Sequence, residues 1–244
     1  MGRDLIISHV RQSDRAIQDN DTHMRGVAER AAQFASEFGM GEWGRVMGML
    51  HDKGKEKNAF QQHILKETGL EPRAVVRGDY SHAYVGALIA KQLFPGYYRM
   101  IDNALMGHHR GLYDDGDREK VQESILPNDV VVDRINADLS VPKITEKKDV
   151  HHLLRMLYSC LVDADYLDTE AFVQPEQSKI RGGHVSLVDL ESKLEAYLRG
   201  LKDNAAHTDV NKVRDDVQKY CLDGCNGPQG YYSLTVPTGG GKTL

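Results

Sequence analysis

The stretch DTHMRGVAERAAQFASEFGMGEWGRVMGMLHDKGK, residues 21–55, decides the fold, because it holds two helical patterns and ends in a His-Asp pair. The first pattern predicts a helix that begins at Asp21 or Thr22 and ends at Gly39. The predicted buried stripe is Val27, Ala31, Phe34 and Phe38. His23 lies four residues before Val27, so its side chain faces the core near the start of this helix.

The second pattern predicts a helix from Glu42 to Asp52, with Gly54 as the residue that ends it. Its predicted inward-facing residues are Trp43, Met47 and Leu50. His51 follows Met47 by four residues and therefore lies on the inward side as well. The His51-Asp52 pair thus stands at the carboxyl end of a helix that packs against the core.

Further helical patterns follow along the chain. The predicted helices are a short one capped by Asn58, one capped by Ser81, one over 97–111, one over 145–172 and one over 185–201. His82 precedes the apolar face of its helix, and His108 and His109 follow apolar residues by four positions. Residues 127–136, PNDVVVDRIN, fit either a strand or a helix. The predicted class is an all-α bundle over 1–205, followed by a linker and a second part over 206–244.

The composition excludes several classes of protein. The 244 residues carry a formal net charge of -5, which argues against a surface that grips nucleic acid throughout but allows one local site. No apolar run is long enough to span a membrane, and the first residues lack a secretory signal, so we expect a cytoplasmic location. Three cysteines give no disulfide framework, and we interpret Cys221 and Cys225 as plain thiols.

Five histidines stand at the ends of predicted helices, beside inward stripes: His23, His51, His82, His108 and His109. Asp52 and the Asp163/Asp165 pair supply carboxylates on the inward faces. Burying so many titratable groups without a cation would be costly, so the set predicts a metal centre. Imidazole and carboxylate ligands favour manganese, cobalt, nickel or iron over magnesium, which prefers oxygen ligands.

The order of these residues resembles a known family. HDKGK at 51–55 is preceded by an isolated histidine and followed by SHA at 81–83, GHH at 107–109 and LVDADYLDTE at 161–170. This series resembles the HD phosphohydrolase superfamily, and within it the HD nuclease domain of the type I CRISPR nuclease-helicase. The resemblance covers about residues 1–205 and implies an HD-domain helical bundle.

The resemblance also implies two divalent metal ions that share one carboxylate. The implied ligands of one ion are His23, His51, Asp52 and Asp165, and those of the other are Asp52, His82, His108 and His109. Asp165 is preferred to Asp163 because the family motif places its aspartate after a small residue, as in the AD of this chain.

Other charged residues and histidines were also considered for roles at the site. Lys55 matches the lysine of the family's HDxGK pattern, and the resemblance implies a catalytic role in neutralising a phosphate. The alternative is a solvated lysine at a helix end. Lys53 and Lys57 are interpreted as surface charge, and Arg110 as a possible phosphate contact. His9 is expected to lie behind the ligands, whereas His63, His151, His152, His184 and His207 receive no role.

The last residues, YYSLTVPTGGGKTL, predict a strand and a glycine-rich turn. They resemble PTGxGKT, the first motif of superfamily 2 helicases. The resemblance implies that Gly239, Gly241, Lys242 and Thr243 would hold ATP in the full-length nuclease-helicase. Because the sequence stops at Leu244, we expect a piece of a RecA-like domain that does not hydrolyse ATP and is mobile or packed opportunistically.

The resemblance implies a metal-dependent nuclease that cuts single-stranded DNA in CRISPR interference, with the surveillance complex as partner. Asp52 would be central to catalysis, because it bridges the two ions. Two alternatives remain: a phosphohydrolase of small nucleotides, and a catalytically idle module that docks DNA or a partner.

Overall fold

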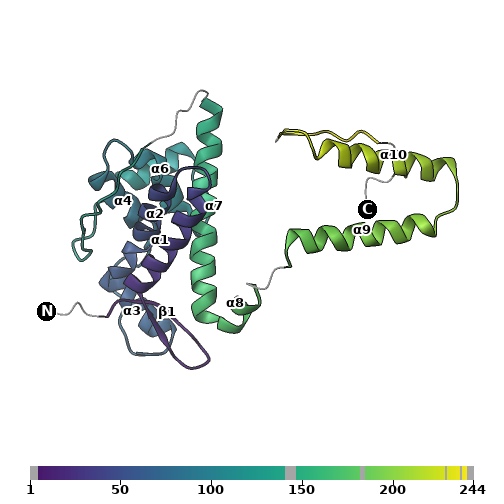
Figure 1. Ribbon diagram of the computed structural model, residues 1–244. Coiled ribbons are helices and arrows are strands. Elements are labelled where there is room, and N and C mark those ends of the chain that lie inside the picture. Colours follow the sequence, from purple (N-terminus) through teal and green to yellow (C-terminus); the bar gives the residue numbers. More distant parts are fainter. Residues whose placement is uncertain (1–4, 141–146, 182–184, 229, 237, 241–244) are drawn as a thin grey trace. The chain divides into compact units, whose positions relative to one another are not determined.

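The computed structural model describes residues 5–140, 147–181, 185–228, 230–236 and 238–240 (Figure 1). The chain forms two compact units, Met1–Gly182 and Gly183–Leu244. This division precedes the domain boundary expected near residue 205, so the predicted helix over 185–201 groups with the second unit. No helix of the described residues is long and apolar enough to cross a membrane.

The first unit is mainly helical, as predicted from the spacing of its apolar residues. Its α-helices are α1 (Asn20–Ser36), α2 (Gly41–Leu50), α3 (Asn58–Glu67), α4 (Ala83–Leu93), α5 (Asp102–Gly107), α6 (Asp115–Gln122), α7 (Lys147–Val173) and α8 (Pro175–Arg181). Two 3-10 helices join them, η1 (Lys53–Glu56) and η2 (Tyr98–Met100). Residues 127–136, left open between strand and helix, form neither.

A short antiparallel hairpin was missed by the all-α prediction. Strand β1 (Ile7–Val10) pairs with β2 (Ile17–Asp19), and Arg15 in the connecting turn has a positive φ of 63°. Four residues are too few for a clear alternating pattern, which explains why the sequence did not reveal the strand. The hairpin matters because it carries Ser8 and His9 to the site described below.

Helices α1, α2 and α7 pack together and form the centre of the first unit, with α7 running alongside the other two (Figure 1). Their shared core is fully buried: Val27, Ala31, Trp43, Met47, Leu50, Leu157 and Leu161. The predicted inward face of α2 is therefore confirmed. On α1 the buried stripe is turned by one residue at its carboxyl end, because Ala35 is buried whereas Phe34 is only partly buried. Phe38, also partly buried, follows the end of the helix.

Four helix boundaries differ from the sequence-based expectation. The N-cap of α1 is Asp19, whose Oδ2 accepts a hydrogen bond from the Thr22 amide at 3.1 Å, so neither Asp21 nor Thr22 is the cap. Helix α2 ends at Leu50, and the chain turns through Asp52 into η1. Gly54 lies within η1 and does not end α2. Asn58 and Ser81 are likewise not N-caps, since Lys57 and His82 occupy those positions.

Two glycines allow backbone segments to approach closely. A Cβ at Gly48 would lie 2.4 Å from the Ala28 Cα, so α2 can pack tightly on α1 only with glycine there. A Cβ at Gly54 would lie 2.2 Å from the carbonyl oxygen of His82. These contacts bring the end of α2 next to α1 on one side and next to the start of α4 on the other.

The second unit contains α9 (Leu187–Asp203) and α10 (Asp209–Gly224), capped by Ser186 and Thr208. The strand predicted in YYSLTVPTGGGKTL is absent from the described residues 231–236, because a strand needs a backbone partner and the described chain supplies none there. Gly239 lies in a turn with a φ of 83°. The predicted nucleotide contacts Gly241, Lys242 and Thr243 lie outside the described residues. Cys221 and Cys225 are free thiols, as predicted.

Candidate metal centre

Asp52 occupies the centre of the site, at the turn between α2 and η1. Its side chain is 1% exposed, and its two carboxylate oxygens face different groups of histidines. Oδ2 lies toward His23 and His51, whereas Oδ1 lies toward His82 and His108. One carboxylate therefore joins two clusters of possible metal ligands.

The inner cluster consists of His23, His51, Asp52 and Asp165, whose ligand atoms all lie within 4.8 Å of one another. The Nε2 atom of His23 is 3.3 Å from Asp52 Oδ2 and 3.2 Å from Asp165 Oδ1. The Nε2 atom of His51 is 3.4 Å and 3.7 Å from the same two oxygens. Helices α1, α2 and α7 thus each supply part of one buried ligand set.

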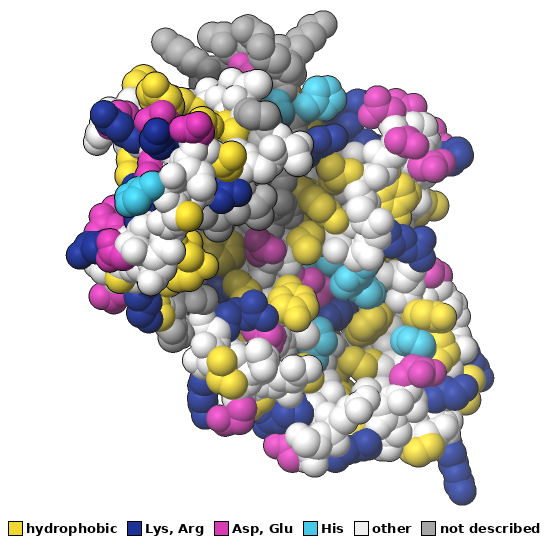
Figure 2. Space-filling view, turned by 90° about the vertical axis from the view of Figure 1, so that its right-hand side faces the viewer, with side chains coloured by type: hydrophobic (Ala, Val, Ile, Leu, Met, Phe, Trp, Pro, Cys, Tyr) yellow, Lys and Arg dark blue, Asp and Glu magenta, His cyan; other side chains and the backbone are white. Residues whose placement is uncertain are grey.

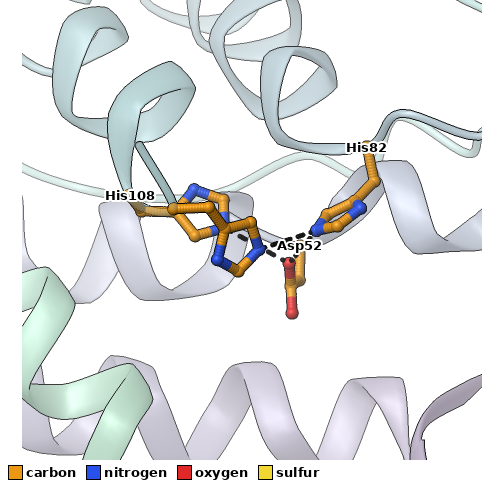
Figure 3. Close-up of side chains that lie close together, drawn as sticks. Asp52, His82 and His108 are labelled. Atoms are coloured by element: carbon orange, nitrogen blue, oxygen red, sulfur yellow. Dashed lines mark hydrogen bonds and ion pairs between the residues drawn. The ribbon is translucent and has the colours of Figure 1, made fainter. Parts of the chain in front are cut away.

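The outer cluster consists of Asp52, His82, His108 and His109 (Figure 3). The Nε2 atoms of His82 and His108 lie 3.5 Å and 3.6 Å from Asp52 Oδ1, and those of His82 and His109 lie 2.9 Å apart. In Figure 3 the labelled imidazoles point toward Asp52 from the starts and ends of different helices. His109 is exposed, so this cluster reaches solvent.

Backbone carbonyls orient two of the imidazoles. His51 Nδ1 donates a hydrogen bond to the Gly48 carbonyl at 2.8 Å, and His108 Nδ1 donates to the Leu105 carbonyl at 2.7 Å. Because Nδ1 carries the proton in each ring, the Nε2 lone pair faces the cluster. The end of a helix therefore fixes both the position and the tautomer of these ligands.

Asp168 orients the third ring and was missed by the sequence analysis. Its Oδ2 accepts a hydrogen bond from His23 Nδ1 at 2.9 Å, which leaves His23 Nε2 for the inner cluster. A Cβ at Gly26 would lie 2.1 Å from Asp168 Oδ1, so the glycine makes room for this carboxylate. The available signal was spacing, since Asp168 follows Asp165 by three residues and shares its face of α7.

Lys55 is buried and ion-paired with Asp52, so it is not a solvated lysine. Its Nζ lies 2.7 Å from Asp52 Oδ2 and donates hydrogen bonds to Ser8 Oγ at 3.2 Å and His9 Nε2 at 3.3 Å. His9 Nδ1 in turn donates to Gln18 Oε1 at 2.9 Å. His9 therefore lies behind Lys55, and both residues support the carboxylate that joins the clusters.

The electrostatics of the two clusters differ. Burial lowers the pKa of His23, but the carboxylates of Asp165, Asp168 and Asp52 outweigh it and raise that pKa to about 10. Burial likewise lowers the pKa of His51, which Asp52 and Asp165 raise to about 9. These carboxylates attract a positive charge, which either a proton on the imidazoles or a shared cation can supply.

Two imidazoles of the outer cluster, those of His82 and His109, show the opposite shift in pKa. Burial, and then the charge of Lys55, lowers the pKa of His82 to about 3 against the pull of Asp52. Burial and the neighbouring His108 lower the pKa of His109 to about 4. Neutral imidazoles have a lone pair available, so these rings are suited to bind a metal without first losing a proton.

The donor set fits divalent metal ions. Asp52 Oδ1 and His108 Nε2 are buried, and neither has a hydrogen-bond partner among the described residues, although both face the outer cluster. Buried polar atoms without partners are costly, and a cation between them removes that cost. Mixed imidazole and carboxylate ligands match first-row transition ions.

Several sequence predictions fall outside the two clusters. Asp163, the alternative to Asp165, is exposed on α7. Arg110 is exposed, and Gly239 belongs to the second unit. The interpretation of Lys53 and Lys57 as surface charge was wrong, because both are 5% exposed. His63 stacks on Tyr80, His151, His152 and His207 are exposed, and His184 lies outside the described residues.

The family comparison agrees with this geometry. The model of the HD domain family matches residues 20–138, a range that includes His23, the His51-Asp52 pair and the outer histidines. This chain therefore contains an HD domain of the HD phosphohydrolase superfamily, with two His/Asp clusters that could bind metal ions. Asp165 and Asp168 lie beyond the matched range. Asp165 was expected from the sequence resemblance, whereas the place of Asp168 in the site rests on the structure alone. A search of curated proteins found no match to the chain.

Proposed function

We propose that this HD-domain hydrolase is a metal-dependent nuclease that cuts phosphodiester bonds in single-stranded DNA. The observation that supports it best is Asp52, whose two oxygens face two clusters of ligands. Divalent ions held by these two clusters would supply Lewis acidity toward a phosphodiester and a water molecule. The HD-domain match supports phosphohydrolase chemistry, and the nuclease assignment extends it.

The residues of the chain have distinct parts in this proposal. The inner and outer clusters would hold one cation each, with their imidazoles oriented by Asp168 and by two backbone carbonyls. Lys55 balances the charge of Asp52 at 2.7 Å and holds its carboxylate in place. The exposed ring of His109 places the outer cluster where a phosphodiester can reach it.

The substrate and the partner are proposed from the sequence resemblance. The series HDKGK, SHA, GHH and LVDADYLDTE, together with PTGGGKT near the end of the chain, resembles the pattern of a type I CRISPR nuclease-helicase. Single-stranded DNA is then the substrate and the surveillance complex the partner. ATP would bind only in a full-length helicase.

Metal analysis joined to a cleavage assay tests the proposal. We expect purified protein to bind up to two ions per chain and to cut a labelled single-stranded DNA faster with manganese, cobalt or nickel than with magnesium. The assay should compare this strand with a duplex, a deoxynucleoside triphosphate and a cyclic dinucleotide. Faster turnover of the small nucleotides would favour the nucleotide-phosphohydrolase alternative.

Two controls separate the remaining outcomes. Cutting by an Asp52→Ala variant at the wild-type rate would trace the activity to a contaminant and would contradict the assignment. Chelation that lowers the melting temperature, with none of the substrates cut under any metal, would favour the idle docking module.

A further inference from the structure

An aromatic pair lies on the surface beside the outer cluster and has no part in metal binding. The rings of His63 on α3 and Tyr80 on the loop before α4 are stacked, with centroids 4.1 Å apart and an interplanar angle of 15°. Tyr80 is nevertheless 48% exposed. Since His63 covers one face of the phenol ring, a further flat group would have to stack on the opposite face.

The pair is close to the candidate metal centre through α3. Phe60 contacts the ring of His82, a member of the outer cluster, with centroids 4.9 Å apart. His63 follows Phe60 by three residues, so it lies on the same face of α3, about 4.5 Å further along the helix axis. One turn of α3 therefore separates the outer cluster from the aromatic pair.

The loop that carries Tyr80 is held on both sides of the ring. The buried Nζ of Lys57 donates hydrogen bonds to Asp79 Oδ2 and to the Ser81 carbonyl, each at 2.9 Å. Asp79 also accepts hydrogen bonds from Ser81 and from the Tyr84 hydroxyl. The backbone on both sides of Tyr80 is thus held in place, while Tyr80 itself stays partly exposed.

The ion pair between Lys57 and Asp79 also affects the charge around Tyr80. Asp79 is the acidic residue nearest to Tyr80 in the sequence, and Lys57 neutralises it. The same loop carries Arg73 and Arg77, both exposed. The phosphate of a nucleotide whose base stacks at this position would therefore not be repelled by an unpaired Asp79 carboxylate.

We infer that the outer face of Tyr80, backed by His63, is a stacking site for a nucleobase of the substrate. Aromatic side chains beside a backbone-binding site are a common means of holding single strands, because every base has a flat face. Figure 2 shows histidine and hydrophobic side chains adjoining one another on one face of the molecule. This inference rests on the proposed function, since it assumes that the phosphodiester cut at the metal centre belongs to a nucleotide.

The test measures binding, which does not depend on cleavage. With a chelator present, fluorescence anisotropy would follow a labelled single strand of mixed sequence and a fully abasic strand of the same length. We expect Tyr80→Ala to weaken binding of the base-containing strand by about 5- to 100-fold and to leave the abasic strand unchanged. A free nucleoside monophosphate as competitor shows whether one base suffices or a strand is needed.

Three further variants serve as controls. Tyr80→Phe keeps the ring and should bind within about twofold of wild type, and His63→Ala should weaken base-dependent binding less than Tyr80→Ala. Val75→Ala removes another exposed apolar side chain from the same loop and should have no effect. If Tyr80→Ala binds the base-containing strand as tightly as wild type, or loses affinity for both strands equally, the stacking site is refuted. Because hydrolysis is blocked throughout, failure of the nuclease proposal would show only in the cleavage assay.

Discussion

The inner and outer clusters share Asp52 but differ in burial and in charge. The inner cluster has two carboxylates and two imidazoles, and both of its histidines are completely buried. The outer cluster adds three imidazoles to the shared carboxylate, and one of them, His109, is exposed. The pKa values of the inner histidines are raised, whereas those of His82 and His109 are lowered.

This difference predicts that the two clusters bind their ions with different affinities and have different roles. A second carboxylate and a lower local dielectric strengthen the attraction for a cation, so the inner cluster should hold its ion more tightly. An exposed imidazole and a single shared carboxylate give a weaker site that a substrate can reach. We therefore expect the inner ion to be structural as well as catalytic, and the outer ion to exchange more readily.

The largest effect should come from Asp52, because both clusters depend on it. Asp52→Ala should lose both ions and reduce hydrolysis to background. It also leaves the buried Lys55 without its counter-ion, which should lower the free energy of unfolding by about 3–5 kcal/mol. Metal content, a cleavage assay and denaturant unfolding in chelator measure these three effects.

A double variant isolates the cause of that instability. Asp52→Ala/Lys55→Met removes the stranded charge and should recover much of the unfolding free energy, while metal content stays at zero. If the double variant is no more stable than the single one, the ion pair of Lys55 is not what makes Asp52 important for folding.

The second largest effect should come from Asp165, which belongs to the inner cluster alone. Asp165→Asn should reduce the bound metal from two ions to one. It should lower the affinity of the inner cluster for its ion by more than the roughly 10- to 100-fold that is typical when a residue that only orients a ligand is removed. Asp163→Asn is the matched control, two residues away on the exposed face of α7. Calorimetric titration with manganese distinguishes them, and equal behaviour of the two variants would contradict the inner cluster.

A smaller effect is expected from His109, the exposed member of the outer cluster. His109→Gln should lower the affinity of the outer cluster for its ion, because one imidazole is lost, but three outer ligands remain and water can replace an exposed imidazole. Binding of the tighter inner ion should not change. Arg110→Gln, at the next exposed position, should leave both ions unchanged. Loss of the tighter ion in the His109 variant would mean that the order of affinities is reversed.

The sequence predicted the ligand set better than its surroundings. The inward position of His23 and His51 could be predicted because each lies four residues from an apolar residue of a regular helix. The spaced motifs then suggested that these histidines belong to one metal centre. Helical periodicity could not show that Lys55 turns inward onto Asp52, because that depends on the 3-10 turn of η1. The resemblance to the family chose Asp165 over Asp163, and the structure brings Asp165 into the cluster.

The features that were missed depend on contacts between distant segments. The β1–β2 hairpin is too short for a clear pattern, and the buried position of Lys57 follows from its bonds to a loop more than twenty residues later. The predicted strand over 231–236 had a suitable sequence but has no partner among the described residues. Local propensity therefore described the helices that carry the site well, but it did not predict α6, α8 or α10, and it described the connections poorly.

The smallest effect, and the sharpest test of the comparison, concerns Asp168, which orients His23 and touches no predicted ion. Asp168→Ala should lower the affinity of the inner cluster for its ion by about 10- to 100-fold and leave the affinity of the outer cluster unchanged. In metal-free protein above pH 10, where the His23 ring is neutral, nitrogen chemical shifts should show that less of the proton is on Nδ1 in the variant than in wild type. Asp168→Asn keeps an acceptor at the same place and should recover most of the affinity.

Gly26→Ala gives an independent route to the same result. Its new methyl group would overlap Asp168 Oδ1, which lies 2.1 Å from the Cβ position, and would force the carboxylate away from His23. If Gly26→Ala and Asp168→Ala lower the affinity for the inner ion to a similar extent, the loss of affinity in both variants comes from a changed orientation of His23. If only Gly26→Ala does so, the damage comes from the packing of α1 on α7, and the inner cluster would then be set by its four ligands alone.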